Sequence, residues 1–266
     1  MIPTQAQELA TRAISGDAAA LEQLLSELHP LVYRLAVRML WHPEDARDAT
    51  QEILIRILTG LSTFRSESAF STWTYRIATN HLLNIRKSRM EEQNYTFQRF
   101  GHELAENLSE RPPQENALLL EEIKLGCTFG MLQCLDRPAR LAYILGEILE
   151  FNHEEAAAVL EITPAAYRQR ISRARSRVVE FMRAHCGLVD AANPCHCSRR
   201  VEFALRAGRV HPDRLLFART PSGNLAFEVE KLDAARSAAA LYRSASDAIP
   251  PMLFTQQIRD LLSGFA

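Results

Sequence analysis

The segment between residues 64 and 89 interleaves aromatic rings, side-chain amides and cations, a mixture suited to contact with opened nucleic acid. Rings stack on unpaired bases, amides hydrogen-bond to base edges and cations bind phosphates. Two candidates, Phe64 and Arg65, lie in a loop predicted over residues 60–70. The other candidates follow at spacings of four, four and three, which predicts a shared helical face: Arg76, Asn80, Asn84 and Lys87.

One helix from about residue 69 to residue 89 should carry that face. Its apolar stripe is predicted to bury Phe70, Trp73 and Ile77, and to reach His81. Phe64 is then the ring left for stacking on a base. The basic residues that close the segment are expected to hold the phosphate backbone: Arg86, Lys87 and Arg89.

A second candidate surface is acidic. Asp45, Asp48 and Glu52 are separated by three and four residues and therefore share a helix face, with Gln51 beside them. Such a face can dock on a basic protein surface, or it can simply be solvated. A catalytic carboxylate pair is a further reading, but no histidine, metal ligand or partner motif accompanies these residues.

A third candidate is a helix-turn-helix. Asn152 precedes a short helix over residues 153–160, and Thr163 and Pro164 suit the N-cap and first turn of a second helix over residues 165–183. Arginine and glutamine near the start of such a helix reach base edges in the major groove, while further arginines bind phosphates. The alternative is a solvated cationic face. The candidates are Arg168, Gln169, Arg173 and Arg175.

The five cysteines form the fourth feature, and an odd number favours free thiols or a metal site over a disulfide framework. Cys186, Cys195 and Cys197 could bind Zn²⁺ or Cu with a histidine as fourth ligand. The candidate histidines are His185, His196 and His211, of which His196 should point away. A redox-sensing disulfide or a turn with buried thiols are the alternatives.

Helical periodicity dominates the chain, so the predicted fold is all-α. Asp17 should cap a helix that Pro30 interrupts, and Pro43 should open the next one. We expect two helical domains at residues 1–90 and 118–185, a linker at 91–117, and an extension at 186–266 with helices near 198–207, 225–245 and 252–264.

Composition narrows the classes of function. The 266 residues carry a net charge of −1, the amino terminus is polar, and no run approaches the ~20 apolar residues that cross a bilayer. We therefore expect a cytoplasmic protein without membrane insertion. An enzyme is disfavoured, because the chain has no phosphate-binding glycine loop, no His-x-x-x-His pair and no nucleophile elbow.

Taken in order, these segments resemble the sigma-70 family, in its extracytoplasmic-function (ECF) group. The similarity spans about residues 5–185 and rests on the runs 43–52, 64–80, 135–140 and 154–175. It departs from the family pattern at Ser66, where a glycine is usual, and at Tyr167, where a β-branched residue is usual.

The resemblance implies a transcription initiation factor rather than an enzyme, with no required cofactor. Asp45, Asp48, Gln51 and Glu52 would bind the β′ clamp helices of RNA polymerase, with a second contact to the β flap. The loop and helix of residues 64–87 would capture a flipped −10 base, and Arg168, Gln169, Ser172 and Arg173 would face the −35 element. An anti-sigma factor or the extension itself would regulate it. The competing hypothesis is a stand-alone helix-turn-helix regulator with a metal- or redox-sensing tail.

Overall fold

A computed structural model describes residues 5–65, 68–88, 91–106, 108–109, 117–213 and 215–218 of the chain. Within these ranges the protein is all-α, as predicted, and its one extended contact is an isolated parallel bridge between Cys186 and Cys195. The chain divides into two compact units. The first contains the described residues up to 88 together with 152–167, and the second contains those of 89–151 and 168–218. The predicted helices at 225–245 and 252–264 lie outside the described residues.

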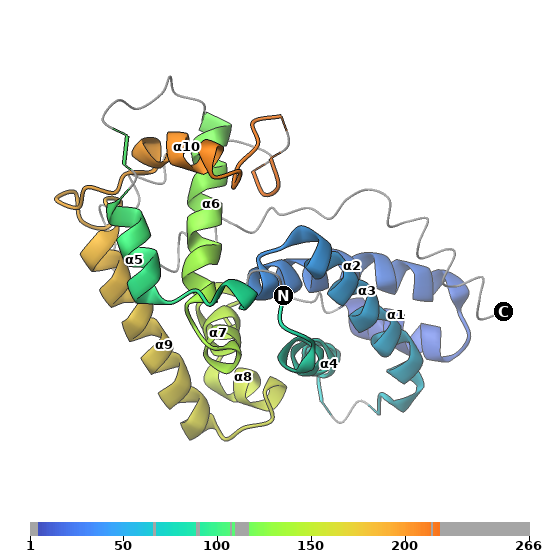
Figure 1. Ribbon diagram of the computed structural model, residues 1–266. Coiled ribbons are helices and arrows are strands. Elements are labelled where there is room, and N and C mark those ends of the chain that lie inside the picture. Colours follow the sequence, from blue (N-terminus) through green and yellow to red (C-terminus); the bar gives the residue numbers. More distant parts are fainter. Residues whose placement is uncertain are drawn as a thin grey trace. The chain divides into compact units, whose positions relative to one another are not determined.

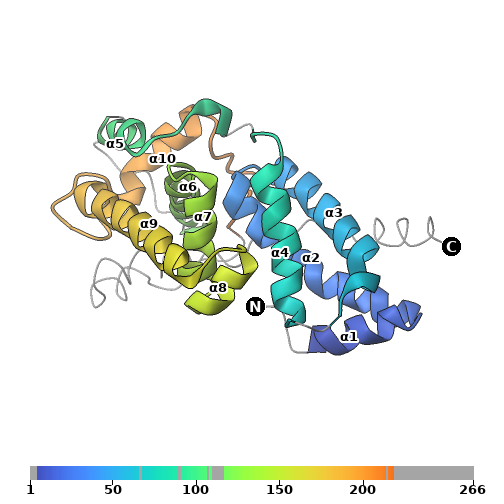
Figure 2. The ribbon, with the colours of Figure 1, turned by 90° about the horizontal axis from the view of Figure 1, so that it is seen from below.

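The first unit is built around α2 (Ala18–Leu40), which packs against both α1 (Gln5–Ile14) and α3 (Pro43–Gly60) (Figures 1 and 2). The Asp17 carboxylate accepts a hydrogen bond from the Ala20 N–H at 3.0 Å and caps α2, as predicted. Pro43 opens α3, where its missing N–H costs nothing. A 3₁₀ turn, η1 (Leu61–Thr63), then leads toward α4 (Phe70–Asn84).

The predicted interruption at Pro30 is wrong, because α2 runs unbroken through it for 23 residues. Proline removes one helical hydrogen bond at a cost of about 3 kcal/mol. The side chains on both sides of it are buried, among them Leu24, Leu28, Val32 and Leu35. Each fully buried side chain of this kind contributes about 1.5–3 kcal/mol, so packing outweighs the local penalty.

The limits of α4 and its buried face differ from the prediction. The helix ends at Asn84 rather than at residue 89, since the next residue, Ile85, is extended. Trp73, Ile77 and His81 are only half-buried. The fully buried stripe instead passes through Phe70, Thr74, Tyr75, Ala78 and Leu82. Thr74 and Ala78 in this stripe are β-branched or small, and they allow α4 to pack closely on α3. The hydrophobicity of the side chains alone does not predict this buried face.

The short helix α8 (His153–Val159) belongs to the first unit and packs against α4. Its start is a capping box, in which the Asn152 side chain accepts from the Glu155 N–H and Glu155 accepts from the Asn152 N–H. In the following turn, the Thr163 hydroxyl accepts from the Ala166 N–H at 3.2 Å at the start of α9 (Pro164–His185). The predicted short helix, turn and long helix are therefore confirmed.

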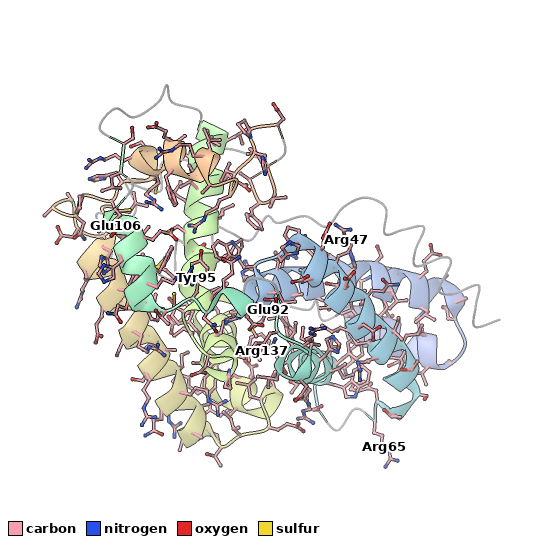
Figure 3. The ribbon with its side chains drawn as sticks, in the orientation of Figure 1. Arg47, Arg65, Glu92, Tyr95, Glu106 and Arg137 are labelled. Carbon is pink, nitrogen blue, oxygen red and sulfur yellow. The ribbon has the colours of Figure 1, made fainter. Side chains whose placement is uncertain are left out.

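The second unit is organised by α6 (Ala117–Gln133), α7 (Arg137–Tyr143) and a π-helical turn, η3 (Ile144–Ile148). Arg140 is 2% exposed and donates to the Leu132 and Leu135 carbonyl oxygens at 2.9 and 3.0 Å, close to the end of α6. It also donates to Glu91 of the 3₁₀ turn η2 (Glu91–Gln93) at 3.1 Å. Arg137, labelled in Figure 3, donates to the same carboxylate.

The range predicted as a linker contains α5 (Phe97–Ala105), which packs on the carboxyl-terminal half of α9. The rings of Phe100 and Phe181 stack with centroids 5.5 Å apart. A Cβ at Gly101 would lie 2.7 Å from the His185 ring, so a larger residue there would require that ring to move. Finally, α10 (Cys197–Arg206) lies across α6 in Figures 1 and 2, close to the predicted 198–207.

Candidate nucleic-acid interface

The acidic face predicted on α3 is present at the surface. Asp48, Gln51 and Glu52 are exposed, whereas Asp45 is half-buried. Asp45 lies 3.5 Å from the Nδ1 atom of His42, and its backbone N–H donates to the same atom. Asp48, Gln51 and Glu52 are therefore available to a partner, while Asp45 stabilises the first turn of its own helix.

The ring of Phe64 is not the free ring that the sequence suggested. It is 9% exposed and packs edge-on against the Phe70 ring, with the two ring centroids 5.2 Å apart. The tilted ring of Trp73 has its centroid 5.6 Å from that of Phe64. Aromatic burial of this kind is favourable. Arg65, next in the chain, is exposed and projects away from the helices in Figure 3. Phe64 can stack on a base only if it leaves this cluster.

Arg76 and Asn80 lie on one face of α4, and both bind the α8 turn within the first unit. Arg76 donates to the Ala158 carbonyl oxygen at 3.0 Å and lies 3.6 Å from the Glu161 carboxylate. The Asn80 amide donates to Glu161 at 3.2 Å. These are exposed interactions, each worth about 0.2–1 kcal/mol.

Asn84 and Lys87 are exposed but do not share one continuous helical face. Asn84 is the last residue of α4 and donates from its side chain to the Asn80 carbonyl oxygen at 2.8 Å. Lys87 lies beyond the helix, in a segment without regular secondary structure. The face predicted from spacing therefore ends at Asn84, because the helix is shorter than its periodicity indicated. Arg89, a further predicted phosphate contact, lies outside the described residues.

The first turns of α9 present four of the five predicted side chains to solvent. Arg168, Gln169, Ser172 and Arg173 are exposed. Arg175 is half-buried and donates to the Glu147 carboxylate of η3 at 2.9 Å. Its contact with DNA stays a prediction, and it would require this bond to break. Tyr167 is fully buried against His153, so the residue that departs from the family pattern serves packing.

The cysteines of the tail lie near a residue that sequence reasoning missed. The backbones of Cys186 and Cys195 form the isolated β-bridge, and Cys197 is the first residue of α10. Cys127 lies in α6. All are free thiols, and in the part of the chain described no three Cys, His, Asp or Glu side chains form a ready metal site. His185 packs instead on Phe181, and His211 is exposed. No sequence spacing links Cys127 to the tail, since 59 residues separate it from Cys186.

Among the described residues, no helix is long and apolar enough to cross a membrane. This agrees with the absence of a long apolar run in the sequence.

Comparison with known protein families identifies two segments of the chain. Residues 24–91 match the family described as Sigma-70 region 2, and residues 128–178 match Sigma-70, region 4. The RNA polymerase sigma-H factor of Pseudomonas aeruginosa is 32% identical over 180 residues, covering 65% of this chain and 92% of that protein. The ECF RNA polymerase sigma-E factor of Escherichia coli K12 is 31% identical over 183 residues, covering 65% and 91%.

A solved structure, CnrH in complex with the cytosolic domain of CnrY, aligns at 24% identity with a TM-score of 0.47. It covers 66% of this chain and 95% of that one. The two relatives and this structure each leave about a third of the present chain unmatched.

Proposed function

The chain belongs to the sigma-70 family, in its ECF group of transcription initiation factors, and from this premise we propose that it directs core RNA polymerase to specific promoters. In this proposal the region 2 segment binds the polymerase and opens the −10 element. The region 4 segment binds the −35 element as duplex. In this proposal the bond-making chemistry belongs to the polymerase.

The observation that carries the proposal is the exposed start of α9, in the segment that matches region 4. Arg168, Gln169, Ser172 and Arg173 follow a capped turn and face solvent. An α-helix fits the major groove of B-DNA, where arginine and glutamine distinguish bases by bidentate hydrogen bonds. Thr163 and the buried Tyr167 hold the start of this helix in place.

The region 2 segment supplies two further surfaces. The exposed Asp48, Gln51 and Glu52 of α3 offer acceptors to a basic polymerase surface. Arg76 and Asn80 of α4 offer a cation and an amide to an unpaired base, and the exposed Arg65 offers a second cation. Extruding a base costs a few kcal/mol of stacking, which these contacts and the aromatic cluster of Phe64 must offset.

For Arg76 and Asn80 to reach DNA, their bonds to Ala158 and Glu161 must break. We therefore place these two side chains in a resting arrangement that promoter binding replaces. The exposed character of the bonds makes this exchange small in energy.

Reconstituted transcription tests the proposal directly. The purified chain, added to core polymerase and a fragmented genomic library, should yield discrete run-off transcripts that core polymerase alone does not make. Replacing Asp48, Gln51 and Glu52 by alanine should abolish co-elution with the core, whereas replacing the exposed Glu44 at the start of α3 should not.

Two results would count against it. Binding of promoter duplex by the chain alone, with no association with core polymerase, would favour the stand-alone regulator. Association with the core but no promoter-dependent transcript would refute the initiation role.

A further inference from the structure

All five cysteines lie in the second unit, and four of them, from three separate stretches of the chain, lie near one another. The backbones of Cys186 and Cys195 pair in the isolated parallel β-bridge. The Gly187 N–H donates to the Cys195 carbonyl oxygen at 2.9 Å. Cys197 follows two residues later and opens α10. Cys127 is contributed by α6, the helix on which α10 packs.

The packing of α10 on α6 brings Cys197 toward Cys127. Cys197 packs against a small apolar cluster that contains Ile123 and Val201. Cys127 lies four residues after Ile123 and therefore shares its face of α6. Charge effects agree with this proximity: burial raises the pKa of Cys127 well above its usual value, and Cys186, Cys195 and Cys197 raise it further.

The loop between Cys186 and Cys195 is built to hold its thiols in place. Backbone N–H groups of Leu188 and Val189 donate to the Cys186 sulfur, which lowers a pKa that burial raises. The Asn193 side chain closes the loop by donating to the Cys186 carbonyl oxygen at 3.2 Å. Backbone donors of this kind are the partners that orient a metal-bound thiolate.

Gly187 allows the two sides of this loop to meet. A Cβ there would lie 2.7 Å from the His196 ring and 2.8 Å from the Cys195 carbonyl oxygen. Only glycine fits this space without shifting backbone atoms. His196 is thereby held against the loop, which leaves the ligand positions to the cysteines.

We propose that Cys127, Cys186, Cys195 and Cys197 bind one Zn²⁺ ion through four thiolates. Four thiolates in a tetrahedron are a typical structural zinc site, with Zn–S distances of about 2.3 Å. Since the thiols are not yet arranged as a formed site, side-chain rotation and a small adjustment of the loop must bring them together. On binding, four thiols give up their protons to solvent and four Zn–S bonds form.

Surrounding cations suit the double negative charge of such a site. Arg200 acts on Cys127 and Cys195, Arg199 acts on Cys195 and Lys124 acts on Cys197, each lowering a thiol pKa that burial raises, whereas Glu121 raises the pKa of Cys197. Without a metal ion, burial keeps these groups as neutral thiols. A divalent cation supplies the charge that allows four neighbouring sulfurs to ionise together.

The site would fasten the extension to the region 4 segment. The apolar cluster between α10 and α6 has four buried members: Ile123, Val201, Ala204 and Val210. Leu119, Leu120, Cys197 and Leu215 pack against this cluster, and Arg200 and Arg209 pair with Glu103 of α5. Small apolar cores of this kind often gain stability from a metal or a disulfide. Zinc bound by Cys127 on one side and by the tail on the other would provide the link.

Zinc content of the full chain tests the proposal. Protein purified with reductant and dialysed should hold about one Zn²⁺ per chain by mass spectrometry. Cys127→Ser should weaken Zn²⁺ binding in a chelator competition by more than about 100-fold, since loss of even an outer hydrogen-bonding partner costs about 10–100-fold. Cys134→Ser is the matched control, because Cys134 is buried at the end of α6 and donates to the Gly130 carbonyl oxygen.

Two further measurements keep the test decisive if Cys127→Ser fails to fold. The Co²⁺-loaded wild-type chain should show charge-transfer absorption of four thiolates, and Gly187→Ala should weaken Zn²⁺ binding although it removes no ligand. The proposal is overturned by full zinc binding in Cys127→Ser or by a Co²⁺ spectrum of three or fewer thiolates. It is equally overturned by a wild-type chain that binds no zinc, including one whose cysteines are paired as disulfides under reductant.

Discussion

Replacing Arg140 by methionine should destabilise the second unit by about 3 kcal/mol. The guanidinium is buried and donates to the carbonyl oxygens of Leu132 at 2.9 Å and Leu135 at 3.0 Å. A longer bond of 3.4 Å reaches Gln133, and Glu91 accepts at 3.1 Å. Methionine fills similar volume and offers no donor.

The magnitude follows from opposing contributions. Hydrogen bonds from a charged donor are worth about 1.5–3 kcal/mol each, and the two short bonds to carbonyl oxygens give about 3–6 kcal/mol. The ion pair with Glu91 adds to this sum. Burial of the guanidinium opposes it, because desolvation lowers the pKa of Arg140 to about 10 despite the nearby Glu91. About 3 kcal/mol remains, within the range for breaking a buried pair.

Two optical signals separate the units in a urea titration. Both tryptophans, Trp41 and Trp73, lie in the first unit, so their fluorescence reports only on that unit. Far-ultraviolet circular dichroism reports helices of both units. Arg140→Met should therefore shift a dichroism transition to lower urea while the fluorescence transition stays in place. Arg173→Met is the control, because Arg173 is exposed on α9 and should shift neither transition.

The reasoning is refuted if Arg140→Met costs less than about 1 kcal/mol, a value typical of a surface substitution. It is also refuted if the fluorescence and dichroism transitions move together, since that would show that Arg140 supports the whole chain rather than its own unit. Hydrogen exchange in α6 and α7 should locate the loss.

Four further outcomes are expected. Asn80→Ala should reduce permanganate-detected promoter opening about tenfold with core binding retained, since one polar contact is worth about 1–2 kcal/mol; equal loss of both would contradict its assignment. Arg173→Ala should weaken binding of the −35 duplex about tenfold, and unchanged affinity in gel shifts would remove it from the DNA-facing set. Glu161→Gln should raise affinity for single-stranded −10 DNA by about two- to fivefold in fluorescence anisotropy, because it loosens Arg76 and Asn80; no gain would show that these bonds do not compete with DNA. Burial lowers the pKa of His29 from 6.5 to about 4. As the pH falls from 6.5 to 4, the unfolded chain therefore binds a proton before the folded chain does, and the free energy of unfolding drops by up to about 3 kcal/mol. His29→Phe should flatten this part of the pH profile of stability, measured by tryptophan fluorescence.

Local signals along the chain predicted most of the helix starts. Asp17, Pro43, Asn152 and Thr163 each begin or cap a helix as expected, because a cap acts on backbone groups only two or three residues away. The buried positions of the region 4 segment were also predictable, since Leu132, Leu141 and Leu145 recur with helical spacing. The exposed side chains at the start of α9 follow from the same periodicity.

Distant contacts decided the remaining features. Pro30 stays within α2 because packing on α1 and α3 outweighs one lost hydrogen bond, and no local rule weighs these against each other. Phe64 is buried by rings that follow it across a loop. Arg175 pairs with Glu147, 28 residues away, although its spacing resembles that of the DNA-facing arginines.

By itself, the sequence determined the order of the two sigma segments, the caps of their helices and the residue types offered to DNA and polymerase. These depend on chemistry within a few residues of each position. Only the tertiary structure decided which of those side chains are free, and it brought Cys127 of α6 to the cysteines of the tail. Such a grouping depends on how one helix packs across another, and spacing along the chain carries no record of that contact.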